Sequence, residues 1–78
     1  MAKSVKVYST PTCPWCIRVK QFLSENNIPF ENNDVYINQA KAQEMIDKSG
    51  QMGVPVLDIE GEIIVGFDKE RIKEALGL

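Results

Sequence analysis

The two cysteines, Cys13 and Cys16, constrain this chain more than any other feature of its sequence. Pro14 and Trp15 separate them, and the chain has no other cysteine and no histidine. A short β-branched and aromatic run precedes the pair, and a run with helical spacing follows it, which predicts a strand-to-helix turn. A Cys-x-x-Cys at such a turn in a small α/β pattern is typical of a redox dithiol.

Length, composition and charge narrow the class of protein. The 78 residues favour one domain, spanning 1–78. With 44% hydrophobic and 26% charged residues, the chain is typical of a soluble globular protein. A net charge of −2 without a Lys/Arg cluster argues against a nucleic-acid partner.

The expected compartment is the cytoplasm, with no membrane partner. No secretory signal is visible, and no apolar run approaches the roughly 20 residues of a membrane helix. In that reducing compartment a lone cysteine pair is more often catalytic or metal-binding than a permanent disulfide.

The pattern of apolar residues predicts an α/β fold with four strands and three helices. Strands are expected at 5–8, 30–33, 54–59 and 62–65, and helices at about 13–26, 39–48 and 69–76. The order is βαβ followed by ββα. The first unit predicts two parallel strands joined by a right-handed crossover. The second adds an antiparallel hairpin, which completes one four-stranded mixed sheet.

The sequence also predicts whether certain side chains face solvent or the core. We interpret three features as solvated, namely Arg18, Lys20 and the acidic run 58–62. Met52 is interpreted as a packing residue, and Tyr8 either as a core residue or as part of a groove. Phe67 is expected in the core or beside the site. The first helix is predicted to bury one apolar stripe at helical spacing, formed by Trp15, Val19, Phe22 and Leu23.

The position of the dithiol assigns different roles to the two cysteines. Disulfide exchange needs a thiolate, whereas a free cysteine near neutral pH is mostly thiol. Cys13 is predicted to lie where the unpaired N–H groups of a helix N-terminus favour negative charge. We therefore expect Cys13 to attack. Cys16 is expected to be more buried and to act as the resolving thiol, and Trp15 to flank the substrate groove.

Two other interpretations of the cysteines are weighed against the redox dithiol. In the first, they only pack or form an inert disulfide. In the second, they bind metal, but structural zinc needs four ligands, and one copy of this chain offers two cysteines. An iron–sulfur centre has the same shortage, unless a second copy or small thiols supply the rest. No metal site is expected within one copy.

Val54-Pro55 is the second feature, and the residues alone leave its geometry open. A trans proline is tolerated at the start of a strand, because its missing N–H need not join the ladder. A cis bond is the other possibility, and it would leave the Val54 backbone free to pair with an extended substrate.

Three motifs, in this order, resemble the glutaredoxins. They are Cys13-Pro14-Trp15-Cys16 after a short strand, Val54-Pro55 before a hairpin, and Gly66-Phe67-Asp68 before the last helix. The resemblance spans essentially the whole chain. It implies a thioredoxin-like fold with sheet order 2-1-3-4, in which the first strand is central, and a cis Val54–Pro55 bond beside Cys13.

The resemblance also implies an activity in electron transport and redox homeostasis. Glutaredoxins reduce glutathione mixed disulfides or protein disulfides, with glutathione as co-substrate and no bound cofactor. Cys13 resembles their nucleophile and Cys16 their resolving cysteine, which implies a redox-active disulfide. The Val54 backbone resembles the partner of the glutathione cysteinyl part, Gln51 a neighbour of its glycyl carboxylate, and Asp68 a neighbour of its glutamyl end. The other implied glutathione-binding positions are Thr10, Pro14, Trp15, Pro55, Gly66 and Phe67.

Three positions depart from the glutaredoxin pattern. Thr10 stands where many members have a lysine, Met52 where many have an arginine, and Lys69 where many have a second acidic residue. The first two changes remove cations that would attract a carboxylate or stabilise a thiolate. Lys69 instead brings a cation to the expected glutamyl end.

Because of these departures, two alternatives to a glutathione-linked reductase remain open. One is a redoxin that donates electrons to ribonucleotide reductase and is recharged by thioredoxin reductase, although the dithiol of that branch usually lacks the Pro-aromatic pair. Another is a dimer that binds an iron–sulfur cluster with glutathione. The favoured interpretation is a monomer with glutathione and disulfide-bearing proteins as partners. A natural selenocysteine replaced by Cys13 would give the same sequence.

Overall fold

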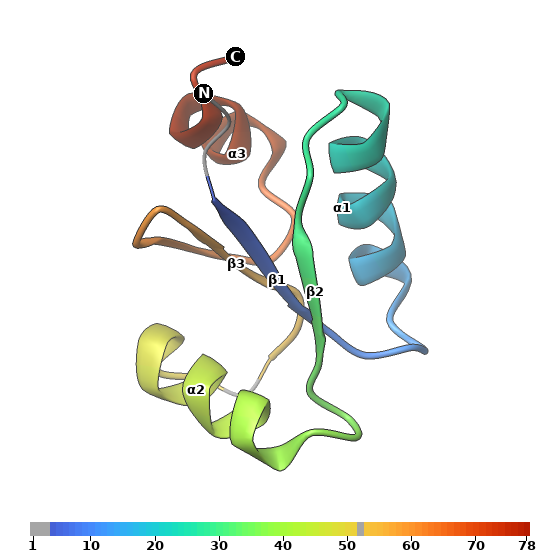
Figure 1. The fold of residues 1–78 in the computed structure, drawn as a ribbon, viewed down its shortest axis with the longest axis vertical. Helices are drawn as coiled ribbons and strands as arrows, with labels where there is room; N and C mark the ends of the chain where they lie inside the picture. Colours follow the sequence, from blue (N-terminus) through green and yellow to red (C-terminus); the bar gives the residue numbers. More distant parts are fainter. Residues whose placement is uncertain (1–3, 52) are drawn as a thin grey trace.

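The computed structural model describes residues 4–51 and 53–78, so the interpretation of Met52 lies outside the described residues. The elements, in chain order, are β1 (Val5–Ser9), α1 (Pro14–Glu25), β2 (Glu31–Asp34), α2 (Gln39–Ser49), β3 (Val56–Ile59), β4 (Glu62–Val65) and α3 (Lys69–Leu76) (Figure 1). This order confirms the predicted α/β class. None of the helices in the described part is both long and apolar enough to cross a membrane.

The four strands form one mixed sheet in the order β2-β1-β3-β4, as the resemblance implied. β1 pairs in parallel with β2 and antiparallel with β3, and β3 forms the antiparallel hairpin with β4. β3 begins at Val56, two residues later than predicted. The physical reason is Pro55, whose nitrogen carries no hydrogen and cannot donate to the ladder.

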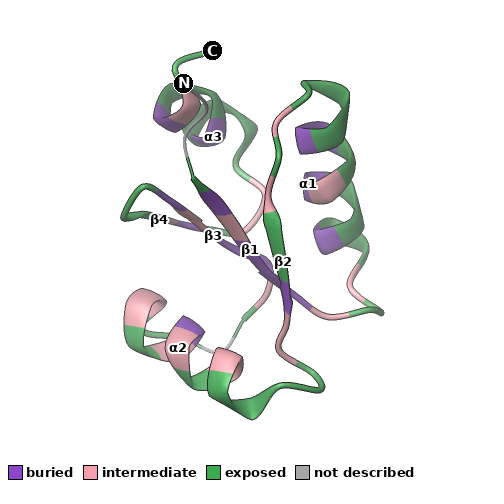
Figure 2. Cartoon of the chain, in the orientation of Figure 1, coloured by how far each residue is buried: buried purple, intermediate pink, exposed green. Residues whose placement is uncertain are grey.

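Helices cover both faces of the sheet, and the core has a part on each face (Figures 1 and 2). β1 is buried along most of its length between them. On the α2 face, Tyr8 of β1, Met45 of α2 and Val56 of β3 form the smaller cluster. The larger cluster joins α1 and α3 to the other face and consists of Val5, Val7, Val19, Phe22, Leu23, Leu57, Ile59, Ile64, Ile72 and Ala75.

Helix α1 buries a different stripe from the predicted one. Trp15 is 55% exposed, so its assignment to the core was wrong. Cys16 takes the inward position in the first turn, because it precedes Val19 by three residues and Leu23 by seven on the same helical face. Trp15 is thereby left at the surface beside the dithiol.

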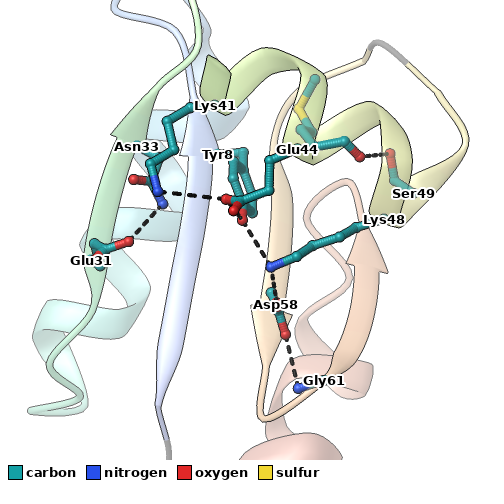
Figure 3. A network of polar contacts seen from close by, with 10 residues as sticks. Tyr8, Glu31, Asn33, Lys41, Glu44, Lys48, Ser49, Asp58 and Gly61 are labelled. Atoms are coloured by element: carbon teal, nitrogen blue, oxygen red, sulfur yellow. Dashed lines mark hydrogen bonds and ion pairs between the residues drawn. The ribbon is translucent and has the colours of Figure 1, made fainter. Parts of the chain in front are cut away.

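A chain of polar contacts fastens α2 to the sheet (Figure 3). The buried Tyr8 donates its hydroxyl hydrogen to the Glu44 carboxylate and accepts a 3.1 Å hydrogen bond from Lys48 Nζ. Lys48 also forms a 2.6 Å ion pair with Asp58 of β3, which accepts a 2.9 Å hydrogen bond from the Gly61 amide. Tyr8 is therefore a core residue, and Asp58, interpreted as solvated, is part of this network.

The network holds its groups in complementary protonation states. Burial raises the pKa of Tyr8, so the hydroxyl keeps the hydrogen that it donates. The hydrogen bond from Tyr8 lowers the pKa of Glu44. Burial alone would raise the pKa of Asp58, but hydrogen bonds from Lys48 and Gly61 hold it below the ordinary value. The hydrogen bond to Asp58 raises the pKa of Lys48. At neutral pH the network contains two carboxylates and one ammonium.

Candidate active site

The dithiol lies at the N-terminus of α1, where the sequence predicts it. Cys13 is the N-cap residue, with extended backbone (φ −91°, ψ 113°), and Pro14 occupies the first helical position. The Cys13 Sγ accepts a 3.2 Å hydrogen bond from the Cys16 backbone N–H. Cys13 is partly exposed and Cys16 is buried, and both are free thiols. The sulfur that a substrate can reach is therefore that of Cys13.

The environment of Cys16 keeps it protonated. Burial raises the pKa of Cys16 to about 11, and the hydrogen bond to Cys13 adds to this effect. A hydrogen bond from the Thr10 backbone and the Lys20 ammonium act in the opposite direction. A thiol with such a pKa is almost entirely protonated at neutral pH, so Cys16 stays a thiol. Cys13 is the sulfur that a substrate can reach.

The loop before β3 forms a wall beside Cys13. The Val54–Pro55 peptide bond is cis, as the resemblance implied. The Val54 carbonyl oxygen lies 3.9 Å from the Cys13 Sγ. Pro55 is buried, and its carbonyl accepts a 2.8 Å hydrogen bond from the amide of Gly66, whose φ of 80° suits glycine. The contact ties the loop after β4 to the loop before β3.

A small, mainly apolar hollow opens next to the dithiol, with a volume of about 240 Å³. It brings together residues from all three motifs of the resemblance. Its lining consists of Trp15, Val54, Pro55, Gly66 and Phe67. The hollow can receive the apolar part of a substrate whose sulfur approaches Cys13.

The other predicted site residues lie around this hollow and do not line it. The Thr10 carbonyl accepts a 3.4 Å hydrogen bond from the Cys13 amide, and Pro14 is exposed at the start of α1. Gln51 is exposed after α2, and its backbone N–H donates to Ser49 Oγ at 3.3 Å. Asp68 is the N-cap of α3 and accepts a 3.2 Å hydrogen bond from the Arg71 amide.

A second, larger hollow of about 420 Å³ was not predicted. Its lining comes from α1, the start of α3 and the residue between the two hollows, Phe67. The residues are Arg18, Gln21, Phe22, Glu25, Phe67 and Lys69. A sequence signal for its α1 side exists, because positions 18, 21, 22 and 25 follow the spacing of one helical face.

Lys20 does not lie on the solvated face that was expected for it. Its Nζ donates a 3.3 Å hydrogen bond to Ser9 Oγ at the end of β1, and Ser9 Oγ donates in turn to Asn32 Oδ1 at 2.7 Å. The ammonium thus bends back toward the end of β1 on the dithiol side of the molecule.

Within residues 4–51 and 53–78, no group of three or more His, Cys, Asp or Glu residues could hold a metal ion.

Comparison with protein families and curated relatives gives a consistent result. A family profile described as glutaredoxin matches residues 5–64, a range that contains both cysteines and Val54-Pro55. An uncharacterised glutaredoxin-like 8.6 kDa protein from Clostridium pasteurianum is 46% identical over 72 residues, or 92% of this chain and 96% of the relative. Glutaredoxin 3 of Escherichia coli K12 is 36% identical over 74 residues, or 95% of this chain and 89% of the relative.

Solved structures are similar over the same extent. The glutaredoxin of Archaeoglobus fulgidus superposes with a TM-score of 0.85 at 28% identity, covering 96% of this chain and 86% of the other. A thioredoxin-like protein superposes with a TM-score of 0.87 at 33% identity, covering 92% of this chain and 99% of the other.

Proposed function

Since the chain belongs to the glutaredoxin family, whose members are thiol–disulfide oxidoreductases, we propose that it reduces disulfides through Cys13 and Cys16 with glutathione as co-substrate. The observation that carries the proposal is the contrast between the two sulfurs. Cys13 is reachable and accepts the Cys16 N–H at a helix N-terminus, whereas Cys16 is buried. This contrast supports the proposal that Cys13 attacks and Cys16 resolves.

The reaction proceeds in two exchanges. The Cys13 thiolate attacks one sulfur of the substrate disulfide, the substrate S–S bond breaks, and a Cys13–substrate disulfide forms. The departing thiolate takes a proton from solvent. Cys16 then loses its proton to solvent and attacks the Cys13 Sγ, which releases the second substrate thiolate. Two electrons pass to the substrate, and a Cys13–Cys16 disulfide remains.

The electrostatics support this sequence. The Cys16 N–H donates to the Cys13 Sγ, which gives the attacking sulfur a fixed hydrogen-bond partner at the helix N-terminus. Interaction with Cys13 contributes to the raised pKa of Cys16. Once Cys13 is in a mixed disulfide it carries no negative charge, so its coulombic contribution disappears while the effect of burial remains. The pKa of Cys16 is then lower than in the reduced protein, which favours its attack after the substrate has been captured.

Glutathione would complete the cycle. One glutathione thiolate attacks the Cys13–Cys16 disulfide and a second releases glutathione disulfide, which returns two electrons to the protein. The hollow beside Cys13 supports this assignment, with Val54 offering its backbone and Trp15 and Phe67 flanking the apolar space. We propose that Gln51 and Asp68 approach the two ends of glutathione. Thr10, Pro14, Pro55 and Gly66 would shape the site through the backbone.

Replacement of each cysteine by serine tests the roles. With a protein disulfide as substrate, Cys13→Ser is expected to abolish reduction. Cys16→Ser is expected to stop after one exchange and accumulate the Cys13 mixed disulfide, visible by mass spectrometry. With a glutathione mixed disulfide, Cys16→Ser is expected to stay active, since glutathione itself can resolve the intermediate. Full activity of Cys13→Ser would refute the assignment.

The reductant is tested separately on the oxidised wild-type protein. Glutathione with glutathione reductase and NADPH is compared with thioredoxin reductase and NADPH, and reappearance of thiols is followed. We expect glutathione to recharge the dithiol faster. Efficient recharging by thioredoxin reductase alone would contradict the glutathione assignment and favour a redoxin that serves ribonucleotide reductase.

A further inference from the structure

Phe67 lines both hollows, so the two adjoin at this side chain. A substrate whose sulfur lies at Cys13 and whose neighbouring residue fills the smaller hollow would place its next residues over Phe67. Resting on the proposed function, we propose that the cleft lined by Arg18, Phe22 and Lys69 binds an acidic side chain of a polypeptide substrate, close in sequence to its reacting half-cystine.

Aromatic rings on α1 hold the two cations of the cleft. The Arg18 guanidinium carbon lies 5.0 Å from the centroid of the Trp15 ring, and Lys69 Nζ lies 5.5 Å from the centroid of the Phe22 ring. Cations over aromatic faces at this range are attracted to the ring quadrupole without being neutralised. The two charges are thus positioned beside the substrate path while their positive field remains.

Neither Arg18 nor Lys69 forms an ion pair within the part of the chain that the structure describes. The ion pairs found there are Lys41–Glu44 and Lys48–Asp58, and neither includes Arg18 or Lys69. Lys69 is also the first residue of α3, the helix end at which the dipole disfavours a cation. Its charge therefore does not stabilise α3, and it remains available to an anionic group.

The charges along the cleft specify the occupant. Glu25, the last residue of α1, lies two helical turns beyond Arg18, so the end of the cleft far from the dithiol is acidic. The expected substrate has its acidic residue at the second position from the half-cystine, after the residue that fills the smaller hollow, and no further acid beyond it. At about 420 Å³ against about 240 Å³, the second hollow is the larger, which suits a polypeptide segment that passes the site.

The test uses two peptides with the same internal disulfide, which carry glutamate in one and lysine in the other at the second position from each half-cystine. Single-turnover reduction by the pre-reduced protein is stopped with acid, and the reduced peptide is measured by chromatography. The variant is Arg18→Glu/Lys69→Glu. The matched control, Arg71→Glu/Lys73→Glu, makes the same change in net charge at exposed α3 positions that do not line the cleft.

Wild type and control are expected to reduce the glutamate peptide about tenfold faster than the lysine peptide at low salt, as summed exposed charge pairs allow. The cleft variant is expected to lose or reverse this preference. About 0.5 M salt should reduce the preference in wild type and control, because screening shortens the range of these interactions. In the opposite direction, Glu25→Gln is expected to increase the rate with the glutamate peptide.

Equal rates with the two peptides in wild type, or the same preference in the cleft variant and its control, would overturn the proposal. A loss confined to glutathione disulfide, with both peptides unaffected, would assign the cations to glutathione carboxylates and also overturn it. Reduction of the uncharged bis(2-hydroxyethyl) disulfide separates failure of the proposed reductase function from failure of the cleft proposal. If neither wild type nor the variants reduce it, the proposed function fails. The charge preference of the cleft is then measured by calorimetric binding of the two peptides with serine in place of cysteine.

Discussion

Replacement of Lys48 by methionine tests whether the polar network stabilises the packing of α2 on the sheet. Lys48 Nζ donates to Asp58 at 2.6 Å and to the Tyr8 hydroxyl at 3.1 Å. Among the described residues, the variant would leave the Gly61 amide as the remaining hydrogen-bond partner of Asp58. Methionine keeps most of the apolar stem, so the loss is mainly polar.

The expected size follows from the burial of the pair. A hydrogen bond between charged groups contributes about 1.5–3 kcal/mol. The side chains of Lys48 and Asp58 are 29% and 12% exposed, so solvent weakens the effect of the deletion relative to a fully buried pair. We therefore expect a loss of about 2 kcal/mol in the free energy of unfolding. For a domain of this size, this lowers Tm by roughly 8–16 °C.

The assay is thermal unfolding at pH 7, followed by circular dichroism. Lys41→Met is the matched control on the same helix, because Lys41 and Glu44 lie 3.6 Å apart with side chains 34% and 35% exposed. Such a pair contributes about 0.3–0.5 kcal/mol, so Tm should fall by no more than about 4 °C. Equal shifts for Lys48→Met and Lys41→Met would refute the assignment of a structural role to the network.

The remaining predictions concern pH, a helix cap and the core. The pKa values of Glu44 and Asp58 in the folded protein lie below their ordinary values. The two carboxylates therefore stabilise the fold above the unfolded pKa values of about 4.3 and 3.9. This stabilisation is lost as the pH falls through the lower folded pKa values. Urea unfolding between pH 7 and pH 2 should show this loss, with a shallower acid dependence in Lys48→Met. Asp68→Ala removes the N-cap of α3 and should cost about 1 kcal/mol, whereas Asp68→Asn should cost much less. Leu23→Ala, at a fully buried core position, should cost about 2–5 kcal/mol in the same assay, and a cost below 1 kcal/mol would contradict its place in the core.

Local signals explain why the dithiol and most elements were predictable. A cysteine at an N-cap followed by proline is a start signal that nearby residues alone determine. The alternation and spacing of apolar residues likewise determined which segments became strands and helices. The cis Val54–Pro55 bond differs, since the residues left it open and only the resemblance implied it.

Contacts between distant segments were beyond the sequence pattern. Periodicity placed Trp15 on an apolar face, but it does not show that Cys16 faces inward in the first turn. The Lys48–Asp58 pair depends on the register of β3 under α2, which no local pattern specifies. In the second hollow, Arg18 lies on a recognisable helical face, whereas Lys69 is brought to it from the other end of the chain by the fold.

The central claim is that Cys13 attacks the substrate while Cys16 stays protonated. It is tested most directly by identifying which cysteine is alkylated. The reduced wild-type protein is treated with substoichiometric iodoacetamide at pH 7, and the labelled cysteine is identified by peptide mass spectrometry. Because Cys16 is buried and burial raises its pKa to about 11, the label is expected almost exclusively on Cys13. Labelling of Cys16 at a rate equal to or above that of Cys13 would contradict the account.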